Sequence, residues 1–194
     1  MKIAIYSGSI PAPLYIENLI LAVAGENYNI YIFGKKYSSI NYNNKNIFFF
    51  STPKNRLFLV GFILYQKLFL IFTKPHSYLK LFKFYYRLCK IEKVRFFDWW
   101  GKILPVVNNL PDIFHVQWAK ALPQWFFLKE IFEVKIILSL RGSHIHYSPL
   151  ADEYLRKKYI DFFPKLDAFH AVSKAIGKQA IKYGANRNNI HVIH

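Results

Sequence analysis

The stretch PDIFHVQWAKALPQWFFLKEIFEVKIILSLRGSHIH, residues 111–146, decides the fold. Two short apolar runs, Ile113–Val116 and Lys135–Leu140, flank a segment that is long enough for a helix and too long for a hairpin turn. Because parallel strands need a long crossover, this pattern predicts a strand, a helix and a second strand joined by a right-handed connection. A polar loop is expected after the second strand.

Polar side chains follow both predicted strands. His115 and Gln117 lie at the end of the first, and the second is followed by Arg141, Ser143, His144 and His146. The carboxyl ends of parallel strands meet at one edge of a sheet, where open α/β folds bind their ligands. We therefore expect the ligand site at this edge.

The N-terminal part of the chain reads as strand, helix and strand. Residues 2–6 predict a buried strand, SGSIPAP a loop, residues 15–26 an amphipathic helix and residues 28–33 a second strand. This βαβ unit begins a doubly wound fold, but its loop lacks the GxGxxG spacing that holds a dinucleotide. A loop at 35–45 and a strand at 46–51 follow.

The last part of the chain repeats the pattern. Ser148 and Pro149 begin a predicted helix, residues 168–172 a strand, and Ser173 caps a helix that Gly184 ends. A further strand begins at residues 190–194. We therefore predict an α/β protein with a mostly parallel sheet.

Composition limits the class of protein. The chain has 194 residues, enough for one domain, and 27 basic against 11 acidic residues give a net charge of +16. This charge favours anionic partners, although a genome rich in A and T codons also enriches lysine. The single cysteine, Cys89, excludes an internal disulfide and a zinc site built from cysteines, which fits a reducing compartment. No histidine spacing typical of a metal site occurs.

Residues 53–109 predict helices, and two of these suit a membrane surface. The apolar run 57–72 is shorter than the ~20 residues of a membrane span and is interrupted by Gln66 and Lys67, so we expect a buried or membrane-resting helix. In the helix at 78–92, a basic face lies beside an aromatic one, which suits acidic headgroups. An ordinary solvated helix explains the same pattern. The predicted membrane contacts are Lys80, Lys83, Arg87 and Lys90.

The segments KIAIYSGS, PDIFHVQW, KIILSLRGSHI, DAFHAVSKAIGKQAIKYGA and NNIHVIH, in this order, resemble the N-terminal domain of family 4 glycosyltransferases. The resemblance implies a Rossmann-like three-layer domain spanning residues 1–194, one half of a GT-B architecture. It also implies a retaining enzyme with a nucleoside diphosphate sugar as donor and no cofactor or metal. The second, donor-binding domain of that family is absent from this sequence, so the isolated chain is expected to be inactive.

The resemblance also assigns site residues. The family's HG-x-D segment corresponds to residues 141–144. This makes Arg141 and His144 the expected catalytic residues. An arginine can bind a diphosphate through two parallel hydrogen bonds. The expected acceptor-binding residues are Ser9, His115, Gln117, Arg141, Gly142 and Ser143.

The expected function is thus the acceptor-binding half of a hexosyl-type glycosyltransferase in bacterial cell-surface polysaccharide or glycolipid synthesis. Its expected partners are a sugar or lipid-linked sugar acceptor, an anionic membrane surface and the missing donor-binding domain, with the protein on the cytoplasmic face of the membrane. Nucleic acid is not expected, because no nucleic-acid-binding motif occurs. The alternative is a non-catalytic module that binds a membrane surface, an anionic polymer or the other subunits of a complex.

Overall fold

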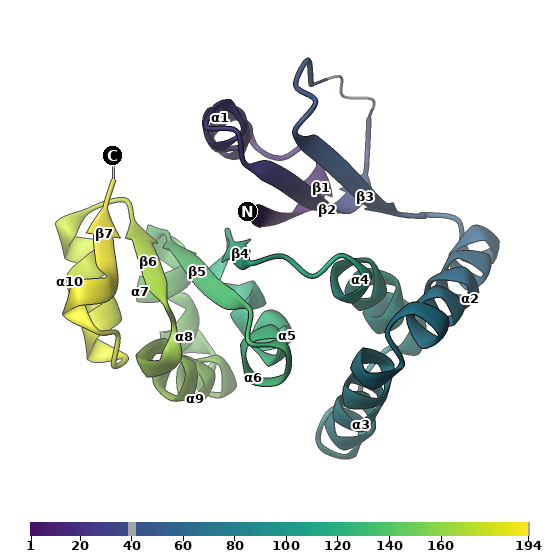
Figure 1. Ribbon diagram of the computed structural model, residues 1–194. Coiled ribbons are helices and arrows are strands. Elements are labelled where there is room, and N and C mark those ends of the chain that lie inside the picture. The colour runs from purple at the N-terminus through teal and green to yellow at the C-terminus, as the bar shows by residue number, and fades with distance from the viewer. Residues whose placement is uncertain (39–41, 194) are drawn as a thin grey trace. The chain divides into compact units, whose positions relative to one another are not determined.

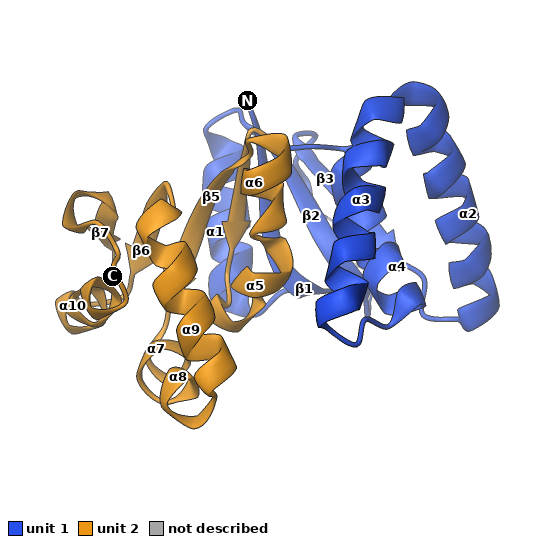
Figure 2. Cartoon of the chain, turned by 90° about the horizontal axis from the view of Figure 1, so that it is seen from below, with its two compact units in different colours: residues 1–111 blue, residues 112–194 orange. Residues whose placement is uncertain are grey.

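The computed structural model describes residues 1–38 and 42–193. The chain divides into two compact units, Met1–Pro111 and Asp112–His194, drawn in blue and orange in Figure 2. Each unit contains parallel strands and helices, so the predicted α/β, Rossmann-like fold class is confirmed.

The sheet of unit 1 has the order β3-β2-β1, and its strands are parallel (Figure 1). They are β1 (Lys2–Ile10), β2 (Asn29–Lys36) and β3 (Ile47–Thr52), with α1 (Leu14–Gly25) joining the first two. The core contains fully buried isoleucines from the strands and from α1, as the alternating and i, i+4 apolar patterns predict. These are Ile5, Ile16, Ile20, Ile30 and Ile32.

Strand β1 is longer than predicted. Instead of a loop, the segment SGS continues the strand through a β-bulge, at which Tyr6 pairs with Phe33 and Gly8 pairs with Gly34. Gly8 has a φ of +84°, and a Cβ on Gly34 would lie 3.0 Å from the carbonyl carbon of Gly8. Two residues without side chains therefore let the strands stay paired past the bulge. Strand β2 also runs past its predicted end, and the predicted loop falls partly on residues 39–41, outside the described part.

Three helices follow β3, as predicted for residues 53–109: α2 (Arg56–Thr73), α3 (Pro75–Ile91) and α4 (Phe96–Asn108). Helix α4 is mostly buried from Trp99 onward and contacts β2 and β3 as well as α2. The contact with α2 is close, since a Cβ on Gly101 would lie 2.9 Å from Cδ1 of Leu59. The hydroxyl of Thr52 donates to the carbonyl of Gly101 at 3.2 Å, which fixes α4 to the end of β3.

Unit 2 has a parallel sheet in the order β4-β5-β6-β7. Its strands are β4 (Ile113–Val116), β5 (Lys135–Leu140), β6 (Ala168–Ala171) and β7 (Ile190–Val192). All four were predicted, although His194, the last residue of the final predicted strand, lies outside the described residues. One face of the sheet packs on the helices: Phe114 contacts Trp125, and Phe169 contacts Phe163.

The connections of unit 2 differ in detail from the prediction. The helix after β4 is broken into η1 (Ala119–Ala121), α5 (Leu122–Trp125) and α6 (Phe127–Phe132). The loop expected after β5 is instead a short helix, α7 (Gly142–His146). The expected helix from Ser148 is two helices, α8 (Ser148–Ala151) and α9 (Glu153–Phe162), followed by η2 (Phe163–Lys165).

The caps explain this last difference. Ser148 does not cap a helix, because its hydroxyl donates to the carbonyl of Ser143, and Asp152 caps α9 by accepting from the amide of Leu155. The predicted cap of α10 (Lys174–Lys182) is confirmed, since the hydroxyl of Ser173 accepts from the amide of Ile176. Gly184 follows with a φ of +90° and ends this helix, and η3 (Arg187–Asn189) leads into β7.

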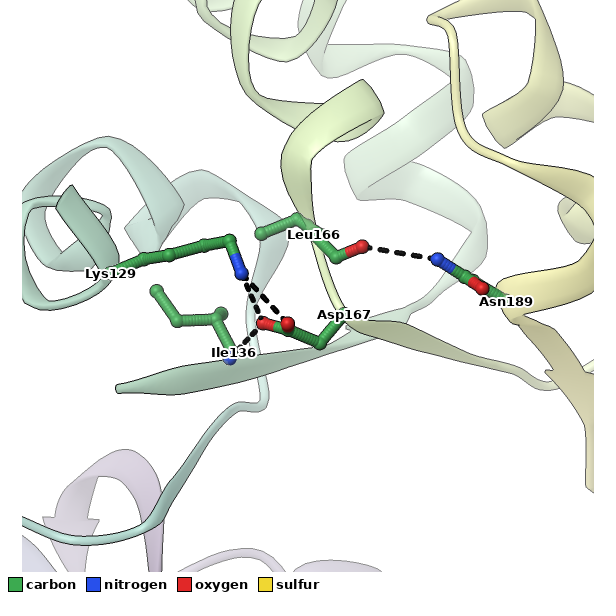
Figure 3. A network of polar contacts seen from close by, with 5 residues as sticks. All are labelled: Lys129, Ile136, Leu166, Asp167 and Asn189. Atoms are coloured by element: carbon green, nitrogen blue, oxygen red, sulfur yellow. Dashed lines mark hydrogen bonds and ion pairs between the residues drawn. The ribbon is translucent and has the colours of Figure 1, made fainter. Parts of the chain in front are cut away.

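Asp167 ties together three elements at the start of β6 (Figure 3). Its carboxylate lies 2.7 and 2.8 Å from Nζ of Lys129 in α6 and accepts a 2.7 Å hydrogen bond from the amide of Ile136 in β5. Beside it, the side-chain amide of Asn189 donates to the carbonyl of Leu166 at 3.3 Å. These contacts fix the amino end of the sheet of unit 2.

Candidate functional site

A polar cluster lies on one face of β4, β5 and β6, opposite the face that packs on the helices. His115 pairs in register with Ile137, two residues before Ser139, and Ser139 pairs with His170. Successive side chains of a strand alternate between faces, so His115, Ser139 and His170 share one face. Nε2 of His115 lies 2.9 Å and Nδ1 of His170 lies 3.2 Å from Oγ of Ser139.

Ser139 is the centre of this cluster and is 1% exposed. Its hydroxyl lies between the two imidazoles and also 3.3 Å from Oε1 of Gln117. The sequence prediction included His115 and Gln117 but missed Ser139 and His170. Both lie inside apolar strand segments, and only the register between strands brings them beside His115.

The protons of the cluster follow from its geometry. His170 Nε2 lies 3.4 Å from the carbonyl oxygen of Ile193, which can only accept, so this contact is a hydrogen bond in the tautomer that carries the proton on Nε2. In that neutral tautomer the Nδ1 atom is an acceptor and competes with Oε1 of Gln117 for the hydroxyl proton of Ser139. When His170 is protonated, Nδ1 donates instead, and the hydroxyl of Ser139 turns to Oε1 of Gln117. The hydroxyl of Ser139 has one proton, so it donates either to Nδ1 of His170 or to Oε1 of Gln117, and Oε1 can only accept.

Both histidines are neutral near pH 7. Burial, with smaller effects of His170 and Arg141, lowers the pKa of His115 to about 3. The pKa of His170 is also lowered, mainly by burial. General acid–base catalysis works best when the pKa lies near the working pH, so His115 is suited to hydrogen bonding and not to proton transfer.

Arg141 joins the cluster from the end of β5. Its Nη2 donates to Oε1 of Gln117 at 3.2 Å, and its guanidinium lies 5.6 Å from the centre of the Trp118 ring. Gln117 is fully buried, and its Nε2 has no hydrogen-bond partner among the described residues. A buried N–H without a partner is costly for stability.

His144 also lies beside Trp118, with its ring centre 5.4 Å from that of the indole. Burial, followed by the charges of Lys120 and Arg141, lowers the pKa of this histidine. Its Nδ1 is buried without a partner among the described residues. Trp118, which was not among the predicted site residues, thus lies close to both predicted catalytic residues.

The other predicted acceptor-binding residues lie at different places. Gly142 begins α7 beside Arg141, and Ser143 is exposed on the same helix. Ser9 belongs to unit 1, where it lies in β1, pairs with Lys35 of β2 and accepts a 2.7 Å hydrogen bond from the hydroxyl of Ser7. Unit 2 therefore brings together His115, Gln117, Arg141 and His144. The roles assigned to all of these residues remain predictions.

No group of three or more histidine, cysteine, aspartate or glutamate side chains suited to a metal ion occurs within residues 1–38 and 42–193. The cluster on β4, β5 and β6 offers imidazoles, a hydroxyl and amides, but no carboxylate. Its chemistry is that of binding oxygen-rich ligands through hydrogen bonds.

The predicted membrane-contact residues Lys80, Lys83, Arg87 and Lys90 are all exposed on α3. Beside them lies an exposed apolar row on the same helix, made of Leu79, Phe82 and Tyr86. Of the residues predicted for the aromatic side of this helix, Leu81, Phe82, Tyr85 and Leu88, only Phe82 is exposed, and Leu81 is buried. Whether this surface of α3 contacts lipid remains a prediction.

Helix α2 is not buried, so the first of the two expectations for it is wrong. Its polar residues face inward: Gln66 accepts from the side-chain amide of Asn108, and Nζ of Lys67 lies 4.0 Å from the centre of the Trp100 ring. By length and composition alone, α2 is long and apolar enough to cross a membrane. Its outward residues are apolar and 44–83% exposed: Leu57, Phe58, Leu64, Tyr65, Leu68, Phe69 and Phe72.

Comparison with known proteins gives a likeness of fold. No protein-family model and no curated protein matches the sequence. The crystal structure of HepE from Anabaena in complex with UDP-glucose matches all of this chain and 43% of its own length, with a TM-score of 0.50 and 11% identity. HepE in complex with UDP and glucose matches with a TM-score of 0.47 and 13% identity, over 44% of its length.

The chain thus spans less than half the length of the HepE chain. At this identity the likeness concerns the fold alone. It fits the expectation that this chain is one half of a GT-B architecture.

Proposed function

We propose that this chain is the acceptor-binding half of a retaining glycosyltransferase of the family 4 type, which transfers a sugar from a nucleoside diphosphate sugar. The observation that carries the proposal is the fold shared over the whole chain with part of HepE, which binds UDP-glucose in its crystal. The family resemblance of the sequence, noted above, supports the same class. The proposed acceptor is a growing polysaccharide or a lipid-linked sugar of a bacterial cell surface.

The polar cluster of unit 2 supports this role. Hydroxyl groups of a sugar need both donors and acceptors. In the cluster, Arg141 and His144 are partly exposed, whereas His115 and Gln117 are buried. Arg141 supplies a positive charge at the same edge, fixed by Gln117 and Trp118. In this proposal Arg141 binds the diphosphate or a carboxylate, and the buried His115 and Gln117 hold Arg141 in place through Ser139 and through Oε1 of Gln117.

The test uses the full-length gene product with UDP-glucose and other nucleoside diphosphate sugars, and measures release of the nucleoside diphosphate. Arg141→Ala is expected to lower kcat/KM by about 100-fold, since a donor to a developing charge contributes about this much. Arg141→Lys keeps the charge but loses the planar fork, so its activity should stay low. Arg156→Ala, at an exposed arginine of α9, is the matched control. Near-normal turnover in Arg141→Ala would remove this residue from the site.

A second function, attachment to a membrane, is favoured by α2 and α3. The outward face of α2 is apolar over its whole length, and α3 presents four basic residues. An apolar helix face beside cations is what a helix lying in the interface of an anionic bilayer needs. We infer that unit 1 rests on anionic lipid, with the protein at the cytoplasmic face of the membrane. The same surface serves the alternative of a non-catalytic membrane-binding module.

A further inference from the structure

We propose that unit 1 contains an anion-binding pocket that takes a phosphate or carboxylate group carried on a ring. The pocket has a volume of about 230 Å³ and is formed by the carboxyl-terminal halves of β1, β2 and β3 together with α4. It lies entirely within unit 1, apart from the cluster on β4, β5 and β6. Its lining residues are Tyr6, Gly8, Phe33, Gly34, Lys35, Phe50, Thr52, Lys102 and Pro105.

The position of the pocket follows from the topology. The three parallel strands β1, β2 and β3 end on the same side of the sheet. Helix α4 lies next to the end of β3, where the hydroxyl of Thr52 donates a hydrogen bond to the carbonyl of Gly101. The carboxyl ends of parallel strands are where open α/β sheets bind ligands. The bulge between Tyr6 and Gly8 falls at this end, and bulges are common beside functional sites.

The charge of the pocket indicates the class of ligand. Lys35 and Lys102 line it, and none of its lining residues is acidic. Within residues 1–38 and 42–193, neither lysine forms an ion pair; the pairs present involve Asp98, Asp167 and Glu153, which lie elsewhere. Two ammonium groups around one pocket repel each other unless an anion lies between them. Lysine binds phosphate and carboxylate as a point charge.

The walls of the pocket indicate that the anion is attached to a ring. Phe33 and Phe50 stack with their ring centres 5.0 Å apart, and Tyr6 adds a third aromatic side chain. Aromatic faces bind flat or ring-shaped groups well. Gly8 and Gly34 also line the pocket and add no side chain to it.

The size of the pocket limits the ligand. Pockets for drug-sized molecules have volumes of roughly 300–1,000 Å³, so this one suits a single ring with its anionic group. The binding of such an anion does not depend on the proposed transferase. If the transferase proposal also holds, the pocket would select an acceptor that carries a phosphate or a carboxylate.

The test is a titration of the ¹⁵N-labelled chain followed by amide chemical shifts. Phenyl phosphate and benzoate are the probes, and benzyl alcohol is the neutral control of the same size. We expect an anionic probe to shift the amides of Gly8, Gly34 and Lys35 with a dissociation constant of about 1 mM. Benzyl alcohol should leave them unchanged. The tighter of the two anionic probes identifies the anion as phosphate or carboxylate.

Variants locate the binding site. Lys35→Gln and Lys102→Gln should each weaken binding of the better probe about tenfold, since each removes one charge-assisted contact. Lys178→Gln, at an exposed lysine of α10, is the control and should bind as the unmodified chain does. The pocket is not an anion site if benzyl alcohol binds equally well, if the shifts map to α3, or if neither lysine variant weakens binding. Each result is read without sugar transfer, so failure of the transferase assay leaves it intact.

Discussion

The ammonium group of Lys67 lies 4.0 Å from the centre of the Trp100 ring, on the inward side of a helix whose outward side is apolar. A lysine normally extends toward water, and burial lowers the pKa of this one. The aromatic face of Trp100 offsets part of the lost hydration through a cation–π contact. Helix α2 is therefore held by its polar residues and presents its apolar ones.

The outward face of α2 should contribute salt-resistant binding to lipid. Leu64→Ser combined with Phe72→Ser removes two side chains that are 58% and 81% exposed, so folding should be little affected. Because burying such a side chain contributes about 1.5–3 kcal/mol, vesicle binding in high salt should fall at least about tenfold. Cosedimentation with phosphatidylglycerol vesicles measures this.

The control for this pair is Leu150→Ser combined with Ile160→Ser, two exposed apolar residues of unit 2. These changes should leave vesicle binding as it is. Equal binding by both double variants would show that α2 is not the contact surface.

The basic face of α3 should contribute the salt-sensitive part. Changing Lys80, Lys83, Arg87 and Lys90 to glutamine removes four charges, each contributing about 1 kcal/mol near an anionic membrane. Binding to anionic vesicles at low salt should fall at least tenfold, toward the level seen with neutral vesicles. Cosedimentation is measured at about 50 mM and about 300 mM salt, below and above the physiological ionic strength. Because salt screens charges, the difference between the two measurements separates the contribution of α3 from that of α2.

A matched control removes the same charge elsewhere, through glutamine at Lys174, Lys178, Lys182 and Arg187 of unit 2, all exposed. If this variant loses as much binding as the α3 variant, net charge and not the α3 surface is responsible.

Acidification should destabilise the chain through His115. The pKa of His115 is about 3 in the folded protein and about 6.5 in the unfolded chain, so its contribution is complete above pH 6.5 and is lost as pH falls toward 3. Between pH 7.5 and 5.0 the free energy of unfolding should drop by about 2 kcal/mol from this residue. Urea denaturation at the two pH values measures the drop. His115→Gln should reduce it; an unchanged pH dependence in this variant would contradict the explanation.

Asp167 should be important for stability although it is partly exposed. Asp167→Ala removes the ion pair with Lys129 and leaves the buried amide of Ile136 without an acceptor, which should cost about 2 kcal/mol. Glu153→Ala is the contrast, because its pair with Lys157 is exposed and should contribute less than about 0.5 kcal/mol. Thermal or urea unfolding compares the two. Similar costs would mean that the amide bond to Asp167 contributes little.

Gly34→Ala should destabilise the sheet of unit 1. The added Cβ would lie 3.0–3.1 Å from backbone atoms of Gly8 and Ser9, which cannot move as a side chain can. Crowding of this kind costs about 1–3 kcal/mol. Gly25→Ala is the control, since a Cβ there meets nothing within 4 Å and alanine favours the end of α1. Equal stability of the two variants would show that the strands separate easily at the bulge.

The parallel strands could be predicted because each is a short apolar run bounded by polar or turn-forming residues. The length of β1 could not, since it depends on Gly8 and Gly34 approaching each other from segments 26 residues apart in the numbering. Likewise, Ser148 has the residue type of a cap, but its hydroxyl bonds to Ser143, and Asp152 takes the role. Several neighbouring residues have the local propensity to cap a helix or to end a strand, and tertiary packing determines which of them does so.

The candidate site was predictable to the same degree. His115, Gln117 and Arg141 were found because they follow apolar strands, and the structure places them within one hydrogen-bonded cluster. Ser139 and His170 were missed because the sequence of a single strand does not determine its register with the neighbouring strand. That register is what brings these two residues together. In α2, the sequence showed Gln66 and Lys67 only as interruptions of an apolar run, whereas the structure shows that they contact Asn108 and Trp100.

The close fit of α2 on α4 also bears on how the protein is handled. With Leu59 seated against Gly101, and with Gln66 and Lys67 held on Asn108 and Trp100, α2 cannot rotate its apolar side inward without breaking all of these contacts. An exposed apolar surface that no local movement can bury promotes self-association in water. Purification should therefore need detergent or lipid from the first step. In the cell, the apolar side of α2 should need a membrane or a partner protein to bind it as soon as the chain has folded.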